Sequence, residues 1–236
     1  MRGTIRQDIT LGQPDFGFVI HDQFHDFFLR RMTDPSQPLR ERDVDPDPVA
    51  QFAKWFDQAA SAGVSQPEAV ALATATTDGA PSVRMVLVKR ADHDGFVFFT
   101  NYESRKGGEL AANPRAALLF HWEPFGRQVR IEGPVVRTTR EESEAYAHSR
   151  ARGSQLSAAA SPQSAVVERR EILEERVAAL DQQHAGTEVR VPDHWGGFRL
   201  DPETFEFWQH RDNRLHDRLR YRRGPGGGWQ IERLAP

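Results

Sequence analysis

The sequence predicts a mainly β protein of the α+β class, an antiparallel Greek-key-like barrel flanked by helices. Short segments that alternate apolar and polar residues follow one another along the chain, and turn residues join them. No repeated strand–helix unit separates these segments, which favours an antiparallel barrel over a parallel nucleotide-binding sheet. Helical patterns precede and interrupt the strand-like segments, so helices should cover the barrel.

The composition is that of a soluble globular protein. Of 236 residues, 38% are hydrophobic and 28% charged, and the net charge is −3, which argues against bulk nucleic-acid binding. There are no cysteines, which excludes disulfides and thiolate metal sites. Since no apolar run approaches the ~20 residues of a membrane span, and the start lacks a signal-peptide core, we expect a cytoplasmic protein without membrane contacts.

The first element expected is a flexible arm over residues 1–46, because repeated prolines interrupt any long regular structure there. A short helix is expected within it near residues 21–32. A second helix should occupy residues 47–63, where apolar residues have helical spacing and an Asp-Pro pair suits the start. From that helix onward, residues 47–236 are expected to form a single domain.

A run of strand-like segments follows this helix. An Asp-Gly-Ala-Pro turn separates the first two segments, and a short helix capped by Ser104 should end before Pro114. The strands expected in this part of the chain are residues 69–77, 82–90, 95–100, 116–122 and 127–138.

Helical patterns then dominate until the chain returns to strands. One helix is expected over residues 140–152 and a long amphipathic one, with Val166 and Val167 on its apolar face, over residues 161–186. A Gly-Pro-Gly-Gly-Gly turn should join the last two strands. The strands expected in this part are residues 198–208, 214–223 and 229–236.

Three groups of cationic and hydroxyl residues indicate anion binding. In an extended strand, Arg214, His216 and Arg218 would lie on one face, about 7 Å apart from one to the next. The opposite, inward face would carry Leu215, Leu219 and Tyr221. The second group consists of Arg84, Lys89, Arg105 and Lys106, the last two at a helix start whose amides suit a phosphate.

The third group lies on the helix expected over residues 140–152. Tyr146 and Arg150 are four residues apart on one helix face, and Ser154 follows one turn later. Two hydroxyls and a guanidinium that converge on one point suit a phosphate monoester. Each group alone could be solvated or paired with some of the 34 acidic residues. Together they favour two phosphorylated ligands, or one ligand with several anionic groups.

Motifs for other chemistries are absent or weak. The sequence has no dinucleotide fingerprint, no P-loop and no nucleophile elbow. His21 and His25 have the spacing of a metal-binding pair, but no third ligand lies near them in sequence, so we expect no metal.

Read in order, several motifs resemble those of the pyridoxine (pyridoxamine) 5′-phosphate oxidase family. The matching segments are RMVLVK, FFTNYESRKGGELAANPRAALLF, GRQVRIEGPV, YAHSRARGSQ, SPQS, HWGGFRL, EFWQ, NRLHDRLRYRR and IERLAP. They run from about residue 47 to residue 236. The resemblance implies a split β-barrel, a homodimer with FMN at the subunit interface, and oxidation of the two vitamin B6 phosphates to pyridoxal 5′-phosphate by O2 with release of H2O2.

The resemblance also assigns residues. It implies an FMN site made of Arg84, Met85, Val86, Leu87, Lys89, Phe99, Thr100, Arg105, Lys106, Gln128, Gln163, Ser164, Trp208 and Arg218. It implies substrate binding by Lys89, Tyr146, Arg150, Ser154, Arg214 and His216, the last two acting as catalytic residues near the reacting carbon. The chain departs from the usual family pattern at Phe99, Ala151, Ala159 and His210.

Two alternatives stay open at this stage. A relative on the same flavin scaffold could oxidise another small aromatic metabolite of dihydrophenazine type. A non-catalytic protein could bind FMN or pyridoxal phosphate without turnover. The complete set around Lys89 favours a phosphorylated substrate, and retention of Arg214 and His216 favours catalysis.

Overall fold

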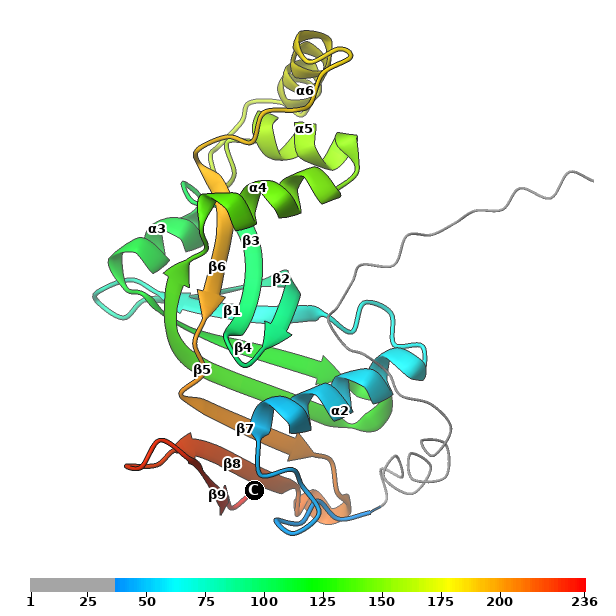
Figure 1. Cartoon of the computed structure of the whole chain (residues 1–236), viewed down its shortest axis with the longest axis vertical. Helices are drawn as coiled ribbons and strands as arrows, with labels where there is room; N and C mark the ends of the chain where they lie inside the picture. The colour runs from blue at the N-terminus through cyan, green and yellow to red at the C-terminus, as the bar shows by residue number, and fades with distance from the viewer. Residues whose placement is uncertain (1–36) are drawn as a thin grey trace, which may run out of the picture.

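The computed structural model describes residues 37–236, and within them nine strands form one sheet. The strands are β1 Ala69–Ala75, β2 Pro81–Asp92, β3 Gly95–Asn101, β4 Arg115–Trp122, β5 Arg127–Arg137, β6 Trp195–Leu200, β7 Thr204–Gln209, β8 Asp217–Arg223 and β9 Trp229–Arg233. Their order is β4-β1-β2-β3-β6-β5-β7-β8-β9, and β4 also pairs with β5. The strands from β4 to β5 in that order therefore close into an antiparallel barrel, which confirms the predicted fold class (Figure 1).

Helices flank this barrel. They are α2 Pro48–Ser61, α3 Arg105–Ala112, α4 Arg140–Ser149, α5 Arg152–Ala160 and α6 Glu171–Gln183, with 3-10 turns η1 Glu123–Phe125 and η2 Asp212–Arg214. The predicted start of α2 is confirmed, because the Asp47 carboxylate accepts a hydrogen bond from Val49 N at 3.0 Å. Ser104 caps α3 as predicted. Helices α4 to α6 extend from one end of the barrel, and β7 to β9 extend from the other (Figure 1).

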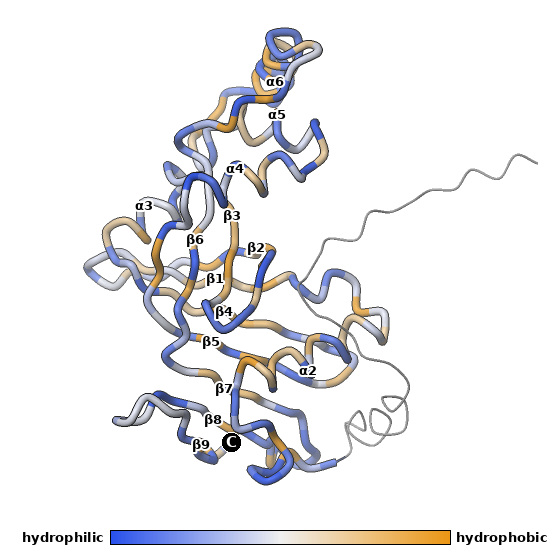
Figure 2. The backbone as a smooth tube through the Cα atoms, viewed as in Figure 1, coloured by the Kyte–Doolittle hydropathy of each residue, from blue (hydrophilic) through white to orange (hydrophobic). Residues whose placement is uncertain are grey.

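Aromatic side chains of α2 pack into the barrel. The Phe52 ring lies 5.0 Å from the Phe96 ring and 4.9 Å from the Phe120 ring, both edge-on, and Trp55 meets Phe207 at 5.2 Å. Burying each such ring contributes roughly 1.5–3 kcal/mol. Hydrophobic residues are frequent along α2 and β3, which contribute to this core, whereas β8 and β9 are mostly hydrophilic (Figure 2).

Strand β5 connects the barrel to the β7–β9 extension. Residues 127–132 pair with β7, and residues 135–137 pair with β6. At the changeover, a Cβ on Gly133 would lie 1.8 Å from the Asp201 carbonyl oxygen, so only glycine fits. The sheet can therefore continue into β7, β8 and β9 while the barrel stays closed.

Two helix predictions are wrong. Helix α6 begins at Glu171 rather than near residue 161, and Val166 is 99% exposed instead of packed on an apolar face. The predicted helix over residues 140–152 ends at Ser149, because Arg150 has an extended backbone, and α5 starts anew at Arg152. A tertiary contact overrides the helical pattern after α5, since Lys106 Nζ donates to Gln163 Oε1 at 2.8 Å.

The predicted helix near residues 21–32 and the His21/His25 pair lie outside the described residues. The end of the predicted arm does lie within them and contacts the β7–β9 extension. Leu39 N donates to Asp217 Oδ2 at 3.1 Å, and the Tyr221 hydroxyl donates to the Asp45 carbonyl at 2.7 Å. Across residues 37–236, no helix combines the length and apolar character needed to cross a bilayer.

Candidate functional site

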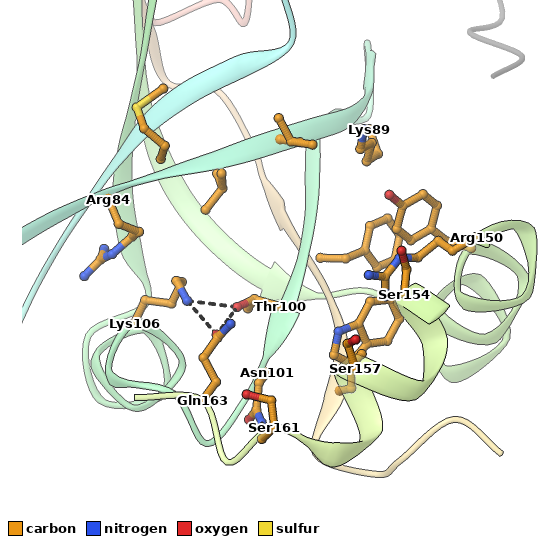
Figure 3. A pocket seen from close by; sticks show the side chains of 17 residues that line it. Arg84, Lys89, Thr100, Asn101, Lys106, Arg150, Ser154, Ser157, Ser161 and Gln163 are labelled. Carbon is orange, nitrogen blue, oxygen red and sulfur yellow. Dashed lines mark hydrogen bonds between the residues drawn. The ribbon is translucent and has the colours of Figure 1, made fainter. Parts of the chain in front are cut away.

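A cavity of about 480 Å³ opens between β2, β3 and the helices α3, α4 and α5 (Figure 3). The structure brings these predicted site residues to it: Arg84, Met85, Val86, Leu87, Lys89, Phe99, Thr100, Lys106, Tyr146, Arg150, Ser154 and Gln163. Sequence reasoning missed other residues that line it: Asn101, Ser157, Ala158, Ser161 and Trp195. The volume is typical of a site for a small organic ligand.

One end of the cavity is built around a buried lysine. Lys106 Nζ donates to Thr100 Oγ1 at 3.1 Å and to Gln163 Oε1 at 2.8 Å, both neutral acceptors (Figure 3). Among residues 37–236 no carboxylate pairs with this ammonium group. Burial, followed by the charge of Arg84, lowers the pKa of Lys106. A buried cation without a counter-charge fits an anionic ligand group.

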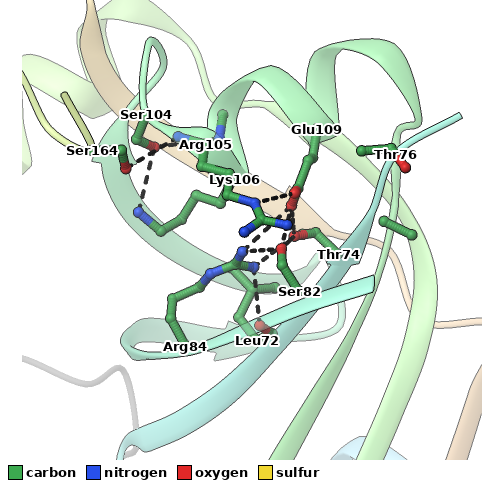
Figure 4. Close-up of polar contacts among 12 residues, drawn as sticks. Leu72, Thr74, Thr76, Ser82, Arg84, Ser104, Arg105, Lys106, Glu109 and Ser164 are labelled. Carbon is green, nitrogen blue, oxygen red and sulfur yellow. Dashed lines mark hydrogen bonds and ion pairs between the residues drawn. The ribbon is translucent and has the colours of Figure 1, made fainter. Parts of the chain in front are cut away.

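Two arginines beside this lysine meet at a carboxylate that the sequence reasoning missed (Figure 4). Arg84 donates to Thr74 Oγ1 at 2.6 Å and lies 3.4 Å from Glu109 Oε2, and Arg105 Nε donates to Glu109 Oε1 at 2.9 Å. Glu109 is buried. Burial would raise the pKa of this carboxyl, but hydrogen bonds from Ser82, Thr74 and Arg105 outweigh it and hold the pKa at about 2.

The other end of the cavity carries the predicted substrate-phosphate group of Lys89, Tyr146, Arg150 and Ser154. The prediction that Tyr146, Arg150 and Ser154 share one helix face is wrong, because α4 ends at Ser149 and Ser154 belongs to α5. The break after Ser149 nevertheless leaves all three on the cavity wall, where Figure 3 labels Arg150 and Ser154.

An aromatic stack forms the floor of this second end. The Phe99 ring lies 3.9 Å from the Tyr146 ring and 5.6 Å from the Trp195 ring, Tyr146 and Trp195 are 6.2 Å apart, and the three rings are nearly parallel. The Arg150 guanidinium lies 5.2 Å from the centre of the Trp195 ring. Burial raises the pKa of Tyr146, so its hydroxyl remains a hydrogen-bond donor at neutral and moderately alkaline pH.

Arg105 and Ser164 line an adjoining hollow of about 340 Å³, which shares Gln163 with the cavity. Arg105 N donates to Ser164 Oγ at 3.2 Å. Ser164 has a left-handed backbone, with φ of 74°, in which non-glycine residues are uncommon. This conformation turns the chain after α5 back toward the start of α3.

The remaining predicted residues do not line the cavity of this chain. Gln128 on β5 stands opposite Trp208 on β7, which stands opposite Arg218 on β8, so the three form one row across the extension. The His216 ring lies 4.6 Å from the Trp208 ring. Its Nδ1 accepts a hydrogen bond from Arg211 N at 3.1 Å, which places the proton of a neutral ring on Nε2.

The prediction that Arg214, His216 and Arg218 lie on one extended strand is wrong for Arg214 and His216, which precede the strand. Strand β8 begins at Asp217, and Arg214 lies in η2 with a left-handed φ of 61°. Leu215, expected to face inward, is 71% exposed, whereas Leu219 and Tyr221 are fully buried as predicted. The strand pattern holds only where β8 pairs with β7.

Two family models match the chain. One, described as pyridoxamine 5′-phosphate oxidase, matches residues 56–184, and the other, described as the pyridoxine 5′-phosphate oxidase C-terminal dimerisation region, matches residues 195–236. The chain belongs to the pyridoxamine 5′-phosphate oxidase family. The resemblance to this family of oxidoreductases that the sequence analysis found is thus confirmed. The match to the dimerisation region indicates that the chain forms a homodimer.

Similar proteins cover most of the chain. The pyridoxine/pyridoxamine 5′-phosphate oxidase of Rubrobacter xylanophilus is 55% identical, over 84% of this chain and 91% of that protein. The protein of the same name from Salinibacter ruber is 55% identical, over 82% and 91%. Among solved structures, PhzG from Burkholderia lata in complex with tetrahydrophenazine-1-carboxylic acid is 34% identical with a TM-score of 0.79, over 86% of this chain and all of that one.

Proposed function

We propose that this family member oxidises pyridoxine 5′-phosphate and pyridoxamine 5′-phosphate to pyridoxal 5′-phosphate, with FMN as cofactor and O2 as acceptor. H2O2 is the by-product, and the amine substrate also consumes water and releases ammonia. The names of the relatives that are 55% identical support this substrate class.

One observation carries the proposal: a single cavity has cationic and hydroxyl groups at both ends. Lys106, Thr100 and Gln163 lie at one end, and Lys89, Arg150 and Ser154 at the other (Figure 3). The second set offers ammonium, guanidinium and hydroxyl donors, and the first offers an ammonium and a hydroxyl with Arg84 on the same cavity wall, so each suits a phosphate monoester. Two phosphorylated ligands side by side are what an FMN-dependent oxidation of a vitamin B6 phosphate requires.

The residues present fit FMN. Buried Lys106 lacks a carboxylate among residues 37–236, and the adjoining hollow holds Arg105 beside the start of α3, whose amides suit a phosphate. We assign Arg84, Arg105, Lys106 and Ser164 to the FMN phosphate and the β2 residues 84–87 to the edge of the flavin. When bound, FMN would supply the two-electron acceptor that takes hydrogen from C4′ of the substrate and passes electrons to O2.

A homodimer would complete the site. The row of Gln128, Trp208 and Arg218 lies on the β7–β9 extension, apart from the cavity of its own chain. Exposed apolar side chains on the barrel, Val83 and Met85 of β2 and Leu119 of β4, offer a surface for a second copy. In a two-fold dimer the row of one subunit would face the cavity of its partner, and the reverse contact would follow by symmetry.

The protein side of the mechanism follows from these positions. Lys89, Arg150 and the two hydroxyls would hold the substrate phosphate, which fixes the ring and lowers the entropic cost of the reactive geometry. The Phe99–Tyr146 stack bounds the space beside that phosphate. Arg214 would polarise the C4′ substituent, and His216, whose Nδ1 is already occupied, would donate from Nε2 rather than accept a proton there.

The direct test is turnover by the purified protein. We expect a yellow flavin spectrum and, on addition of pyridoxine 5′-phosphate in air, equal formation of aldehyde and peroxide. A flavin spectrum without turnover of either vitamin B6 phosphate would refute the proposal.

A second candidate is oxidation of a dihydrophenazine-type metabolite, favoured by the similarity to PhzG. The carboxylic acid bound in that structure carries no phosphate, so Lys89, Tyr146, Arg150 and Ser154 would lack the group that they suit. Competition by inorganic phosphate separates the two candidates. Phosphate should inhibit turnover of a vitamin B6 phosphate, whereas oxidation of a dihydrophenazine that phosphate does not inhibit would favour the second candidate.

A further inference from the structure

Glu109 is a buried carboxylate inside a region that otherwise gathers positive charge. It lies on α3, is 6% exposed, and receives hydrogen bonds from hydroxyls of β1 and β2 as well as from two arginines. Both arginines belong to the set that we assign to the FMN phosphate. By charge alone, the Glu109 carboxylate would repel a phosphate bound nearby and weaken its binding. A buried carboxylate at this position therefore suggests a second, favourable role.

The contacts of the two arginines show what that role is. Arg84 is held on several sides, by the Leu72 carbonyl at 3.1 Å, by Thr74 and Ser82, and by Glu109 (Figure 4). Its guanidinium therefore has one orientation available, fixed against β1 and β2.

Arg105 is held at a single atom. Its Nε donates to Glu109 Oε1 at 2.9 Å, and its side chain is 63% exposed. Arg105 lines the hollow together with Gln163 and Ser164, and the bond to Glu109 uses only its Nε, which leaves both terminal amino groups available to a ligand there. A guanidinium presented in this way is suited to a phosphate, because two parallel N–H groups match two phosphate oxygens.

We propose that Glu109 is a positioning residue that orients Arg105 toward the phosphate of FMN, beside an Arg84 that β1 and β2 already hold in place. This rests on the proposed function, since it assumes that FMN binds here. Arg84, Arg105 and Lys106 carry three positive charges, and Glu109 carries one negative charge. The formal charge of these four residues is therefore +2, which matches a phosphate dianion. Its carboxyl stays ionised throughout the working pH range.

Substitution of Glu109 separates orientation from charge. Glu109→Gln removes the negative charge, which by itself would strengthen phosphate binding. It also replaces one of the two carboxylate oxygens by an amide N–H₂, which cannot accept a hydrogen bond. The arginine that donates to that oxygen then loses its acceptor and must turn away. Glu109→Asp keeps the charge but withdraws the carboxylate from both arginines. If orientation dominates, both variants weaken FMN binding.

The experiment measures dissociation constants of FMN and of riboflavin for the apoprotein, by quenching of flavin fluorescence. Riboflavin lacks the phosphate, so the FMN-to-riboflavin ratio isolates the phosphate contribution. We expect Glu109→Gln and Glu109→Asp to weaken FMN binding tenfold or more and to change riboflavin binding less than twofold. Glu174→Gln is the matched control, since Glu174 pairs with Arg170 on the exposed helix α6 and lines neither the cavity nor the hollow, and it should leave both constants unchanged.

Three results would overturn the inference: unchanged FMN binding, tighter FMN binding, or equal weakening of both flavins, which would mean a general structural role. If Glu109→Gln does not fold, Glu109→Asp decides by the same criteria. Wild-type protein that fails to prefer FMN over riboflavin would instead refute the proposed cofactor, so the two failures are distinguishable.

Discussion

Glu68 Oε1 lies 3.6 Å from Lys89 Nζ, so a carboxylate stands beside the subsite that we assign to the substrate phosphate. Glu68 also acts on Tyr146: burial raises the pKa of that hydroxyl, the charge of Arg150 opposes this, and the negative charge of Glu68 adds a smaller rise. Unlike Glu109, it makes a loose ion pair without a hydrogen bond to the lysine. Its effect on a bound phosphate should therefore be mainly repulsion.

Replacing Glu68 by Gln should tighten binding of the phosphorylated substrate and product. One charge at this depth is worth on the order of 1 kcal/mol, or roughly fivefold in affinity. We expect a lower KM for pyridoxine 5′-phosphate, stronger inhibition by pyridoxal 5′-phosphate, and a kcat that falls if product release limits turnover.

Steady-state kinetics and equilibrium binding of the product check this. Glu203→Gln serves as the control, because Glu203 pairs with Arg115 on the surface and does not line the cavity. A raised KM in Glu68→Gln would show instead that the carboxylate holds Lys89 in place.

The division of the predicted site between the cavity and the β7–β9 extension predicts complementation between subunits. Arg150→Ala removes a half-buried cavity residue, and Arg214→Ala removes an exposed residue of the extension; neither belongs to the buried core, so both variants should fold. Each variant alone should retain flavin. Each should lose roughly 10²-fold or more in kcat/KM, as for removal of a charged group that acts in the transition state.

In a mixed dimer, one site would combine both defects and the other would combine none. After dissociation and random reassociation of an equal mixture, activity should therefore return to roughly a quarter of the wild-type value. Activity is measured before and after reassociation, with each variant reassociated alone as the control. A mixture that stays inactive would place both residues in the site of one chain.

The lowered pKa of Lys106 should make the stability of the apoprotein rise with pH while the affinity for FMN falls. Burial lowers its pKa below the usual 10.5, so the folded protein releases this proton at a lower pH than the unfolded chain does. The unfolded state then binds more protons in that interval, and the apoprotein gains stability as pH rises through it. FMN binding should weaken over the same interval, because the phosphate loses its ammonium partner.

Fluorescence titrations with FMN between neutral pH and pH 10 check the second trend, and chemical unfolding of the apoprotein checks the first. Lys106→Met is the matched variant, since it keeps the side-chain length without a titrating group. It should bind FMN more weakly at neutral pH and lack the lysine-dependent decline. An identical pH profile in both proteins would exclude Lys106 as its source.

The sequence predicts the barrel well because the strand signals are local. The turn before β2 and the cap of α3 depend on neighbouring residues alone, and both are confirmed. The helix expected from residue 161 fails because its pattern competes with a contact from a distant element, the bond from Lys106 to Gln163. Such contacts have no local signature.

The same distinction explains the candidate site. Lys89, Tyr146, Arg150 and Ser154 were grouped by cation and hydroxyl content, which survives the wrong helix geometry because all four still reach the cavity. Glu109 was missed because acidic residues on helix surfaces are common, and only the fold shows that this one is buried between two arginines. Trp195 could have been suspected from its place before two glycines.

Gly197 on β6 makes room for the aromatic stack of the substrate end. A Cβ there would lie 2.6 Å from Thr138 Oγ1 and 2.9 Å from a ring carbon of Phe99. In Gly197→Ala, Thr138 and Phe99 must therefore shift, which disturbs the stack of Phe99 on Tyr146. We expect a loss of about 1–3 kcal/mol in the free energy of unfolding, as for other overpacked sites. The KM for the phosphorylated substrate should rise as well.

Gly108→Ala is the matched control, because an added Cβ at this exposed position in α3 meets nothing within 4 Å. It should stabilise the protein by roughly 0.5–1 kcal/mol, since alanine favours a helix more than glycine does. Chemical unfolding and steady-state kinetics of the two variants separate backbone freedom from steric space. If Gly197→Ala were as stable and as active as Gly108→Ala, the position of Phe99 would not depend on the space beside this glycine.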